Sequence, residues 1–363
     1  MGAAEDVLLR TVPVGRNRDS AAGRRRVART WVWATLALST GALVLAALLA
    51  PPPSSTPDRA LAWLLFVGSS VHVASTGWLF GLPEVRAHAM SRRARFVVLP
   101  GLLVAGCAVL AVVLPPRGIS WLLLPFFAWQ FFHFQKQNLG MVALVASSQR
   151  LAPLARTERR AITVAGCAGI CGLVARPGLL QLQLGFDAGL VFELATVAFS
   201  LCCLVGAAVL KAREPAARPA SFCVAFVMAL VFFAPVFLFS SPYAAIGGAT
   251  IAHGLQYVLL VGLVASGSRS GRTRTMRIAL FCNVALIGGL ALNVASHLHG
   301  AATWGRLLFG VYLGVSMAHF VVDGGFWRLR EPFPRAFMAS NVPYLLGHDQ
   351  TTPPTDRSAG DIR

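Results

Sequence analysis

Apolar runs of bilayer length follow one another along most of this sequence, separated by short polar stretches. A transmembrane helix needs about 20 predominantly apolar residues, and the hydropathy pattern predicts ten such helices. They lie at 31–50, 61–82, 96–115, 119–147, 161–176, 184–210, 220–239, 243–266, 276–296 and 305–326. The run at 161–176 is short and carries three glycines. We therefore expect that helix to be short, tilted or re-entrant.

This pattern predicts an all-α polytopic membrane protein, a bundle of about ten transmembrane helices. The composition agrees, because 56% of the 363 residues are hydrophobic, only 13% are charged and the mean hydropathy is +0.66. We expect one transmembrane helical domain at 31–328. A basic cytoplasmic head at 1–30 precedes it, and a cytoplasmic tail at 329–363, partly disordered, follows it.

A formal net charge of +18 would suit nucleic-acid binding, so the placement of the basic residues decides its meaning. Most of them lie in the head, in the tail and in every second polar segment, at 83–95, 148–160, 211–219 and 267–277. Positively charged segments stay on the cytoplasmic side of a membrane. The alternation therefore predicts a multi-pass protein of the cell membrane with both termini in the cytoplasm, with the lipid bilayer as its surroundings and no nucleic-acid partner.

Four histidines lie within predicted spans, where an ionisable residue costs about 2.5–3.5 kcal/mol on insertion scales. They are His72, His133, His253 and His319. With both termini in the cytoplasm, their four spans cross the membrane in the same direction. Each histidine lies about 10–14 residues from the outer end, and at about 1.5 Å per residue their depths differ by about 6 Å. We expect the four rings to meet in one layer.

Each of these histidines is followed, four residues later, by a side chain that can form hydrogen bonds: Thr76, Gln137, Tyr257 and Asp323. Residues at i and i+4 share a helix face, so a second polar layer is expected beneath the histidines. Such layers orient imidazoles that bind metals, and several neutral imidazoles suit iron, copper or zinc. The four histidines are therefore the predicted metal ligands, although a single intramembrane histidine often only packs against a neighbouring helix.

Lys136 follows His133 by three residues, in a run that stays mostly apolar toward its cytoplasmic end. Extension of the ammonium group to the membrane surface is therefore disfavoured. A buried lysine titrates readily, so we expect Lys136 to be a proton donor, a counter-ion for an anionic substrate or the ion-pair partner of Asp323. With Gln137 and Tyr257, these two residues form the predicted acid–base and orienting set.

Four segments centred on the histidines are similar to a known family. They are SVHVAST at 70–76, FHFQKQN at 132–138, IAHGLQY at 251–257 and MAHFVVD at 317–323, roughly 30 residues in all. Their pattern resembles the retinal-forming β-carotene dioxygenases of bacteria. The resemblance implies a polytopic membrane enzyme with histidine-bound iron. That family carries a second histidine where this chain has Tyr257.

Three functions remain open from the sequence. The first is a multi-pass membrane enzyme of oxidoreductase or oxygenase type, with a buried metal site and oxidative chemistry on a small or lipophilic metabolite. The second is a metal-independent acid–base enzyme of bacterial secondary metabolism and antibiotic biosynthesis, such as a nitrite-dependent enzyme that forms the N–N bond of a diazo group. The third is a proton-coupled transporter, because intramembrane His, Asp and Lys also build proton relays.

Overall fold

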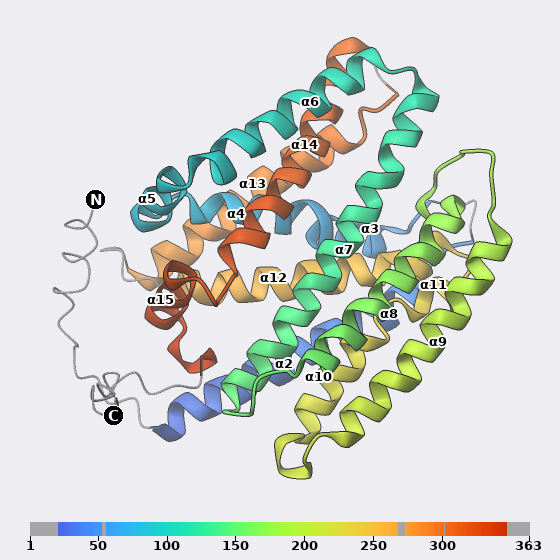
Figure 1. The fold of residues 1–363 in the computed structure, drawn as a ribbon. Coiled ribbons are helices and arrows are strands. Elements are labelled where there is room, and N and C mark those ends of the chain that lie inside the picture. Colours follow the sequence, from blue (N-terminus) through green and yellow to red (C-terminus); the bar gives the residue numbers. More distant parts are fainter. Residues whose placement is uncertain (1–20, 53–55, 268–272, 301, 347–363) are drawn as a thin grey trace, which may run out of the picture.

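The computed structural model describes residues 21–52, 56–267, 273–300 and 302–346, and every regular element in these ranges is helical (Figure 1). The α-helices are α2 (Ala21–Leu49), α3 (Arg59–Phe66), α4 (His72–Leu79), α5 (Pro83–Ser91), α6 (Leu99–Val113), α7 (Pro116–Ser148), α8 (Arg156–Ala175), α9 (Gly189–Ala212), α10 (Ala220–Leu230), α11 (Ala234–Leu238), α12 (Gly248–Gly267), α13 (Arg274–Ser296), α14 (Thr303–Phe326) and α15 (Pro332–Asn341). Short π-helical turns at Val67–Val71, Ala94–Val98 and Tyr243–Gly247 lead into α4, α6 and α12.

Seven helical stretches in the described residues are long and apolar enough to cross a membrane: Ala22–Leu49, Arg59–Leu79, Ala94–Val113, Gly189–Ala212, Tyr243–Gly267, Arg274–Ser296 and Thr303–Phe326. Each coincides with one of the predicted runs. The expectation of an all-α membrane protein is confirmed at this level. The count of ten spans and the orientation of the termini stay predictions.

The three other predicted runs are helical as well, but they differ from simple spans. The run at 119–147 lies in α7, which has 33 residues and is therefore about 50 Å long, well beyond a hydrocarbon core of about 30 Å. The run at 161–176 lies in α8. The run at 220–239 was predicted as one helix, and the structure divides it into α10 and α11. Pro235 agrees with the break, because proline has no N–H to continue a helix and is favoured in the first turn, where it lies in α11.

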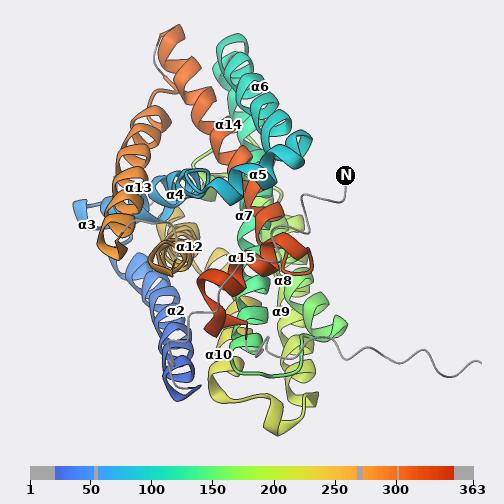
Figure 2. The same cartoon turned by 90° about the vertical axis from the view of Figure 1, so that its left-hand side faces the viewer.

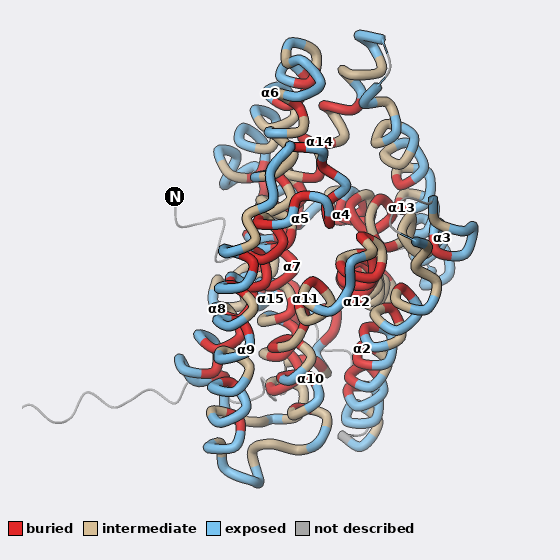
Figure 3. The backbone as a smooth tube through the Cα atoms, turned by 90° about the vertical axis from the view of Figure 1, so that its right-hand side faces the viewer, coloured by how far each residue is buried: buried red, intermediate tan, exposed pale blue. Residues whose placement is uncertain are grey.

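Helix α12 lies at the centre of the molecule. In its most apolar 18-residue stretch 72% is buried within the protein, against 17% for α13. Viewed nearly along its axis in Figure 2, α12 is surrounded by α2, α4, α7 and α13. Figure 3 shows α12 and the middle of α7 largely buried, whereas α9 and α6 are exposed over much of their length. The central helices therefore present polar residues to protein, not to lipid.

Close backbone contact fixes the crossing of α12 with the π-helical turn before α4. A Cβ atom on Gly254 would lie 2.5 Å from the Cα of Gly68, and one on Gly68 would lie 2.5 Å from the Cα of Ile251. Small residues allow helices to approach this closely in a membrane. The crossing lies beside His72 and His253, so it sets the distance between them.

The two predicted flanking segments are only partly described. Residues 1–20 of the predicted head lie outside the described residues, and 21–30 form the first turns of α2. In the predicted tail, α15 packs against α14, with the ring centroids of Phe337 and Phe326 5.1 Å apart. Glu331, just before α15, forms an ion pair of 2.7 Å with Arg92. The expected disorder concerns residues 347–363, which also lie outside the described residues.

Candidate metal centre

Four helices bring the four predicted histidines together in one layer. His72 is the first residue of α4, and the others come from α7, α12 and α14. The ring centroid of His72 lies 4.9 Å from that of His253 and 5.1 Å from that of His319. The ring of His133 lies 5.0 and 5.2 Å from the same two rings. The rings thus form a closed ring of four neighbours, which we call the histidine layer, and the expectation that the four rings meet is confirmed.

The histidine layer buries ring nitrogens without giving them partners. Its four side chains are 0–7% exposed. Both ring nitrogens of His72 and His253, and Nε2 of His133 and His319, have no hydrogen-bond partner among the described residues, which makes six such atoms. Each buried polar atom without a partner costs about 1–3 kcal/mol, although the ring of His72 also lies beside the backbone of Gly68 and Ser69 in the preceding turn. Edge-to-face ring contacts offset little of this.

The unpartnered nitrogens are arranged as metal ligands would be. Potential ligand atoms of His72, His253 and His319 lie within 4.8 Å of one another, and so do those of His133, His319 and Asp323. His319 belongs to both groups, but its Nδ1 is 2.7 Å from the hydroxyl of Thr76, so only Nε2 remains to bind a metal. One nitrogen has one lone pair for one ion. The layer therefore fits a single metal centre better than two.

The second polar layer exists, and each of its members reaches a helix other than its own. Thr76, on the helix of His72, bonds the ring of His319. The hydroxyl of Tyr257, on the helix of His253, lies 2.8 Å from that of Thr76. Gln137, on the helix of His133, donates to the backbone carbonyl of His253 at 2.9 Å. The second layer thus ties the four helices together in pairs.

The bond between Thr76 and His319 can run in two directions, with different consequences for metal binding. If Nδ1 of His319 donates to the Thr76 hydroxyl, the Thr76 hydroxyl donates to Tyr257 and the lone pair of Nε2 is free. In the opposite direction Nε2 carries the ring proton and cannot bind a metal. The direction of the hydrogen-bonded row from His319 through Thr76 to Tyr257 is therefore coupled to the tautomer of His319, on which metal binding by Nε2 depends.

Asp323 is the buried carboxylate of the site. Its Oδ1 accepts a hydrogen bond of 2.5 Å from Nε1 of Trp327, and its Oδ2 lies 3.7 Å from Nε2 of His133. The indole therefore holds one oxygen and leaves the other directed toward the histidine layer. Trp327 was not among the predicted site residues. Its i+4 spacing from Asp323 was the available signal, because residues at this spacing share a helix face.

Two phenylalanines hold the imidazole rings in place. The ring of Phe134 stacks on His253, with centroids 3.9 Å apart and planes inclined by 20°. Phe320 stacks on His133 at 4.8 Å and 27°. Both phenylalanines are neighbours of site histidines along the chain, and the sequence reasoning did not assign them a role. Each of these two imidazoles is thus stacked against one phenylalanine ring, which restricts its rotation.

Lys136 is not part of this site, and the expectation of a buried lysine beside Asp323 was wrong. Its side chain is exposed, and its ammonium nitrogen lies 5.9 Å from the ring centroid of Phe132, which is also exposed. The reason is the packing of α7 against α8. Gln135 is buried against Gly166 and donates to the carbonyl of Ile162 at 2.6 Å, and this orientation turns the next residue, Lys136, to the surface of the bundle.

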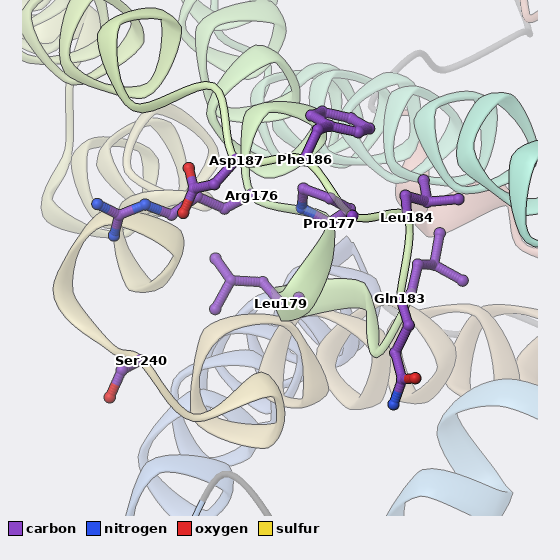
Figure 4. Close-up of a pocket in the computed structure, with 11 residues that line it drawn as sticks. Arg176, Pro177, Leu179, Gln183, Leu184, Phe186, Asp187 and Ser240 are labelled. Atoms are coloured by element: carbon purple, nitrogen blue, oxygen red, sulfur yellow. The ribbon is translucent and has the colours of Figure 1, made fainter.

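A second, open hollow lies far from the histidines along the chain, in the loop between α8 and α9. It has a volume of about 600 Å³, and its lining includes Arg176, Gln183, Asp187 and Ser240 (Figure 4). The guanidinium of Arg176 lies 3.5 Å from the ring centroid of Phe192. We call this open hollow, lined by residues of the segment between α8 and α9 and by Ser240, the loop hollow. None of the predicted site residues lines it.

Comparison of the chain with protein-family models, with curated proteins and with solved structures found no match.

Proposed function

We propose that this protein is a multi-pass enzyme of the cell membrane, with both termini in the cytoplasm and one metal ion bound in the histidine layer. The observation that carries the proposal is the group of six buried ring nitrogens without partners. A metal ion would bind several of these nitrogens at once, whereas ordinary helix packing would leave them buried without partners.

In this proposal Nε2 of His319 and one nitrogen each of His72 and His253 are the ligands, and His133 with Asp323 lies within reach of the same centre. Imidazole ligands suit iron, copper or zinc. Iron or copper would supply oxidative chemistry, which agrees with the resemblance of the histidine segments to the bacterial β-carotene dioxygenases. The stacked phenylalanines and the surrounding helices exclude water, which suits a small or lipophilic substrate.

The residues around the centre have separate tasks. The row from His319 through Thr76 to Tyr257 holds the tautomer in which Nε2 can bind. Asp323, fixed by Trp327, lies beside His133 and can accept a proton from it. A substrate that releases or takes up a proton would exchange it with this pair, whose closest atoms face one another across 3.7 Å.

The test is the metal content of the purified protein, measured by elemental analysis after extraction in a mild detergent. We expect nearly one iron, copper or zinc ion per chain, and its loss in His253→Ala. His297→Ala is the matched control, because His297 is exposed and bonds only near its own helix end. Wild-type protein that is folded and free of metal, even after incubation with each ion, would refute the proposal.

A second candidate is the metal-independent acid–base enzyme, and the pair formed by His133 and Asp323 favours it. Their closest atoms are 3.7 Å apart within the buried site, a distance from which a small reagent or one water could bridge them. A nitrite-dependent conversion of an amine by metal-free protein, abolished in Asp323→Asn, would support this function. Lys136 has no place in this version, because its side chain is exposed.

A further inference from the structure

One buried face of α2 carries a line of polar groups directed into the bundle. Trp31, Thr35 and Ser39 follow one another at intervals of four residues, and all three are at most 3% exposed. Residues spaced by four share a helix face, and the line is about 12 Å long. Nε1 of Trp31 and Oγ1 of Thr35 have no hydrogen-bond partner among the described residues.

A small cavity lies opposite this line, between α2, α7, α10 and α12. Its volume is about 30 Å³, and its polar lining consists of Thr35, Ser39, Asn138 and Gln256. Nδ2 of Asn138 is also without a partner among the described residues, and the side chain is 4% exposed. A buried water needs about 10–15 Å³ of such space and two to four polar partners. The cavity meets both conditions for one water.

Hydrogen bonds connect the cavity with the histidine layer. Gln256 donates to the hydroxyl of Ser39 at 2.8 Å on one side and accepts from Gln137 at 3.0 Å on the other. Gln137 also donates to the carbonyl of His253, and its own side-chain oxygen has no partner among the described residues. Gln256 lines the cavity, and the side-chain amide of Gln137 therefore connects it with the backbone carbonyl of His253.

We propose that this cavity binds a water molecule, held by Asn138 and Thr35, which completes the hydrogen bonds of the polar line on α2 beside the histidine layer. Gln256 lines the cavity and bonds Gln137, so the water lies at one end of the hydrogen-bonded row that reaches the backbone carbonyl of His253. The water also accounts for the polar residue Asn138, which the metal site does not use as a ligand.

This inference goes beyond the proposed function and does not depend on it. Buried polar groups need hydrogen-bond partners whichever function the histidine layer serves. The water site can be tested on protein that contains no metal. Failure of the water site would leave the metal proposal untouched, and failure of the metal proposal would leave the water site untouched.

The experiment is X-ray hydroxyl-radical footprinting of the full chain in detergent micelles. Radicals formed from a bound water oxidise the nearest side chains before they diffuse away. Met141 lines the cavity and is the reporter. Met338 is buried as well, 1% exposed against 7% for Met141, and does not line the cavity. We expect Met141 to be oxidised several-fold faster than Met338.

Two variants link that oxidation to the proposed water. Asn138→Leu fills the cavity, and Thr35→Val removes one hydroxyl with little change in shape. We expect the rate at Met141 to fall to that of Met338 in Asn138→Leu and partly toward it in Thr35→Val. Thr163→Val, on the exposed face of α8, is the control and should change nothing. Equal rates at the two methionines in the wild type would overturn the inference, and so would a rate at Met141 that neither variant changes.

Discussion

The histidine layer and the loop hollow are opposite kinds of site. The loop hollow offers about 600 Å³ of open space, and its polar side chains can be hydrated at no cost. The histidine layer, in contrast, keeps six ring nitrogens out of water without hydrogen-bond partners in the part of the chain that the structure describes. An open hollow does not lower the stability of the folded chain, whereas each buried nitrogen without a hydrogen-bond partner does. Unpaired burial is therefore the stronger indication of function here.

The largest effect is expected where the backbone sets the geometry of the histidine layer. Gly254→Ala places a Cβ against the backbone of Gly68, so α12 and α4 must separate and His253 must move from His72. We expect a loss of at least about 1–3 kcal/mol of stability together with loss of bound metal. Thermal unfolding and elemental analysis measure the two.

The control for this change is Gly140→Ala on α7, where a Cβ would meet nothing within 4 Å. That substitution should raise the stability by roughly 0.5–1 kcal/mol, because alanine favours a helix over glycine. If Gly254→Ala retained full metal and stability, the close crossing would not control the histidine layer.

The next effect concerns the choice of tautomer. Thr76→Val keeps the shape of the side chain but removes the hydroxyl that joins Tyr257 to His319. We expect the affinity for the metal to fall by about 10–100-fold, as is usual when a partner of a ligating histidine is lost. Competition with a chelator of known affinity measures it. Thr76→Ser should restore most of the affinity, and an unchanged affinity in Thr76→Val would show that the hydroxyl selects nothing.

A smaller effect is expected in the loop hollow. Arg176→Gln removes the contact of the guanidinium with Phe192, which contributes about 0.5–1 kcal/mol at an exposed position. The melting temperature should fall slightly, while the metal content stays at the wild-type value. Loss of metal in this variant would reverse the comparison, because it would make the loop hollow part of the centre.

The smallest effect concerns a histidine outside the membrane-spanning stretches. His88 on α5 stacks on Phe333 of α15, with centroids 4.0 Å apart. Burial, and then the charge of Arg92, lower the pKa of His88 below its ordinary value of 6.5, although Glu331 opposes them. Because the folded state favours the neutral ring, packing of α15 is strongest above about pH 6.5 and weakens as the pH falls below it.

Limited proteolysis after Arg335, at about pH 7.5 and about pH 5.5, measures this change. Wild-type α15 should be cut faster at the lower pH. In His88→Phe, where the stacking partner cannot be protonated, the rates at the two pH values should be nearly equal. A wild-type rate without pH dependence would show that the half-buried ring of His88 does not control α15.

The sequence predicted the histidine layer better than its surroundings. His72, His133, His253 and His319 could be aligned by depth alone, because helix rise is constant and the spans are well marked. The rotation of a helix about its axis is not set by depth. Gln135 packs against Gly166 and turns Lys136 outward, and this contact between α7 and α8 is invisible in the residues around Lys136.

The sequence also did not predict where helices break and where they begin. Hydropathy treated 220–239 as one run, although Pro235 ends α10 and begins a new short helix. The run at 184–210 was predicted to begin five residues before α9 does, because apolar Leu184 and Phe186 belong to the lining of the loop hollow. Apolar composition measures burial in lipid or protein alike, so it cannot separate a helix from the buried loop that precedes it.

The residues of the histidine layer are synthesised at different times, because they lie far apart in the chain. Thr76 and His319, which share a hydrogen bond, are 243 residues apart in the chain. At roughly 5–20 residues per second, the ribosome needs about 12–50 s to travel from one to the other. His133 and His253 are made during that interval, and the first three histidines exist without His319 until α14, the last long helix, follows. The nascent protein thus passes through a stage in which the histidine layer lacks one of its four rings.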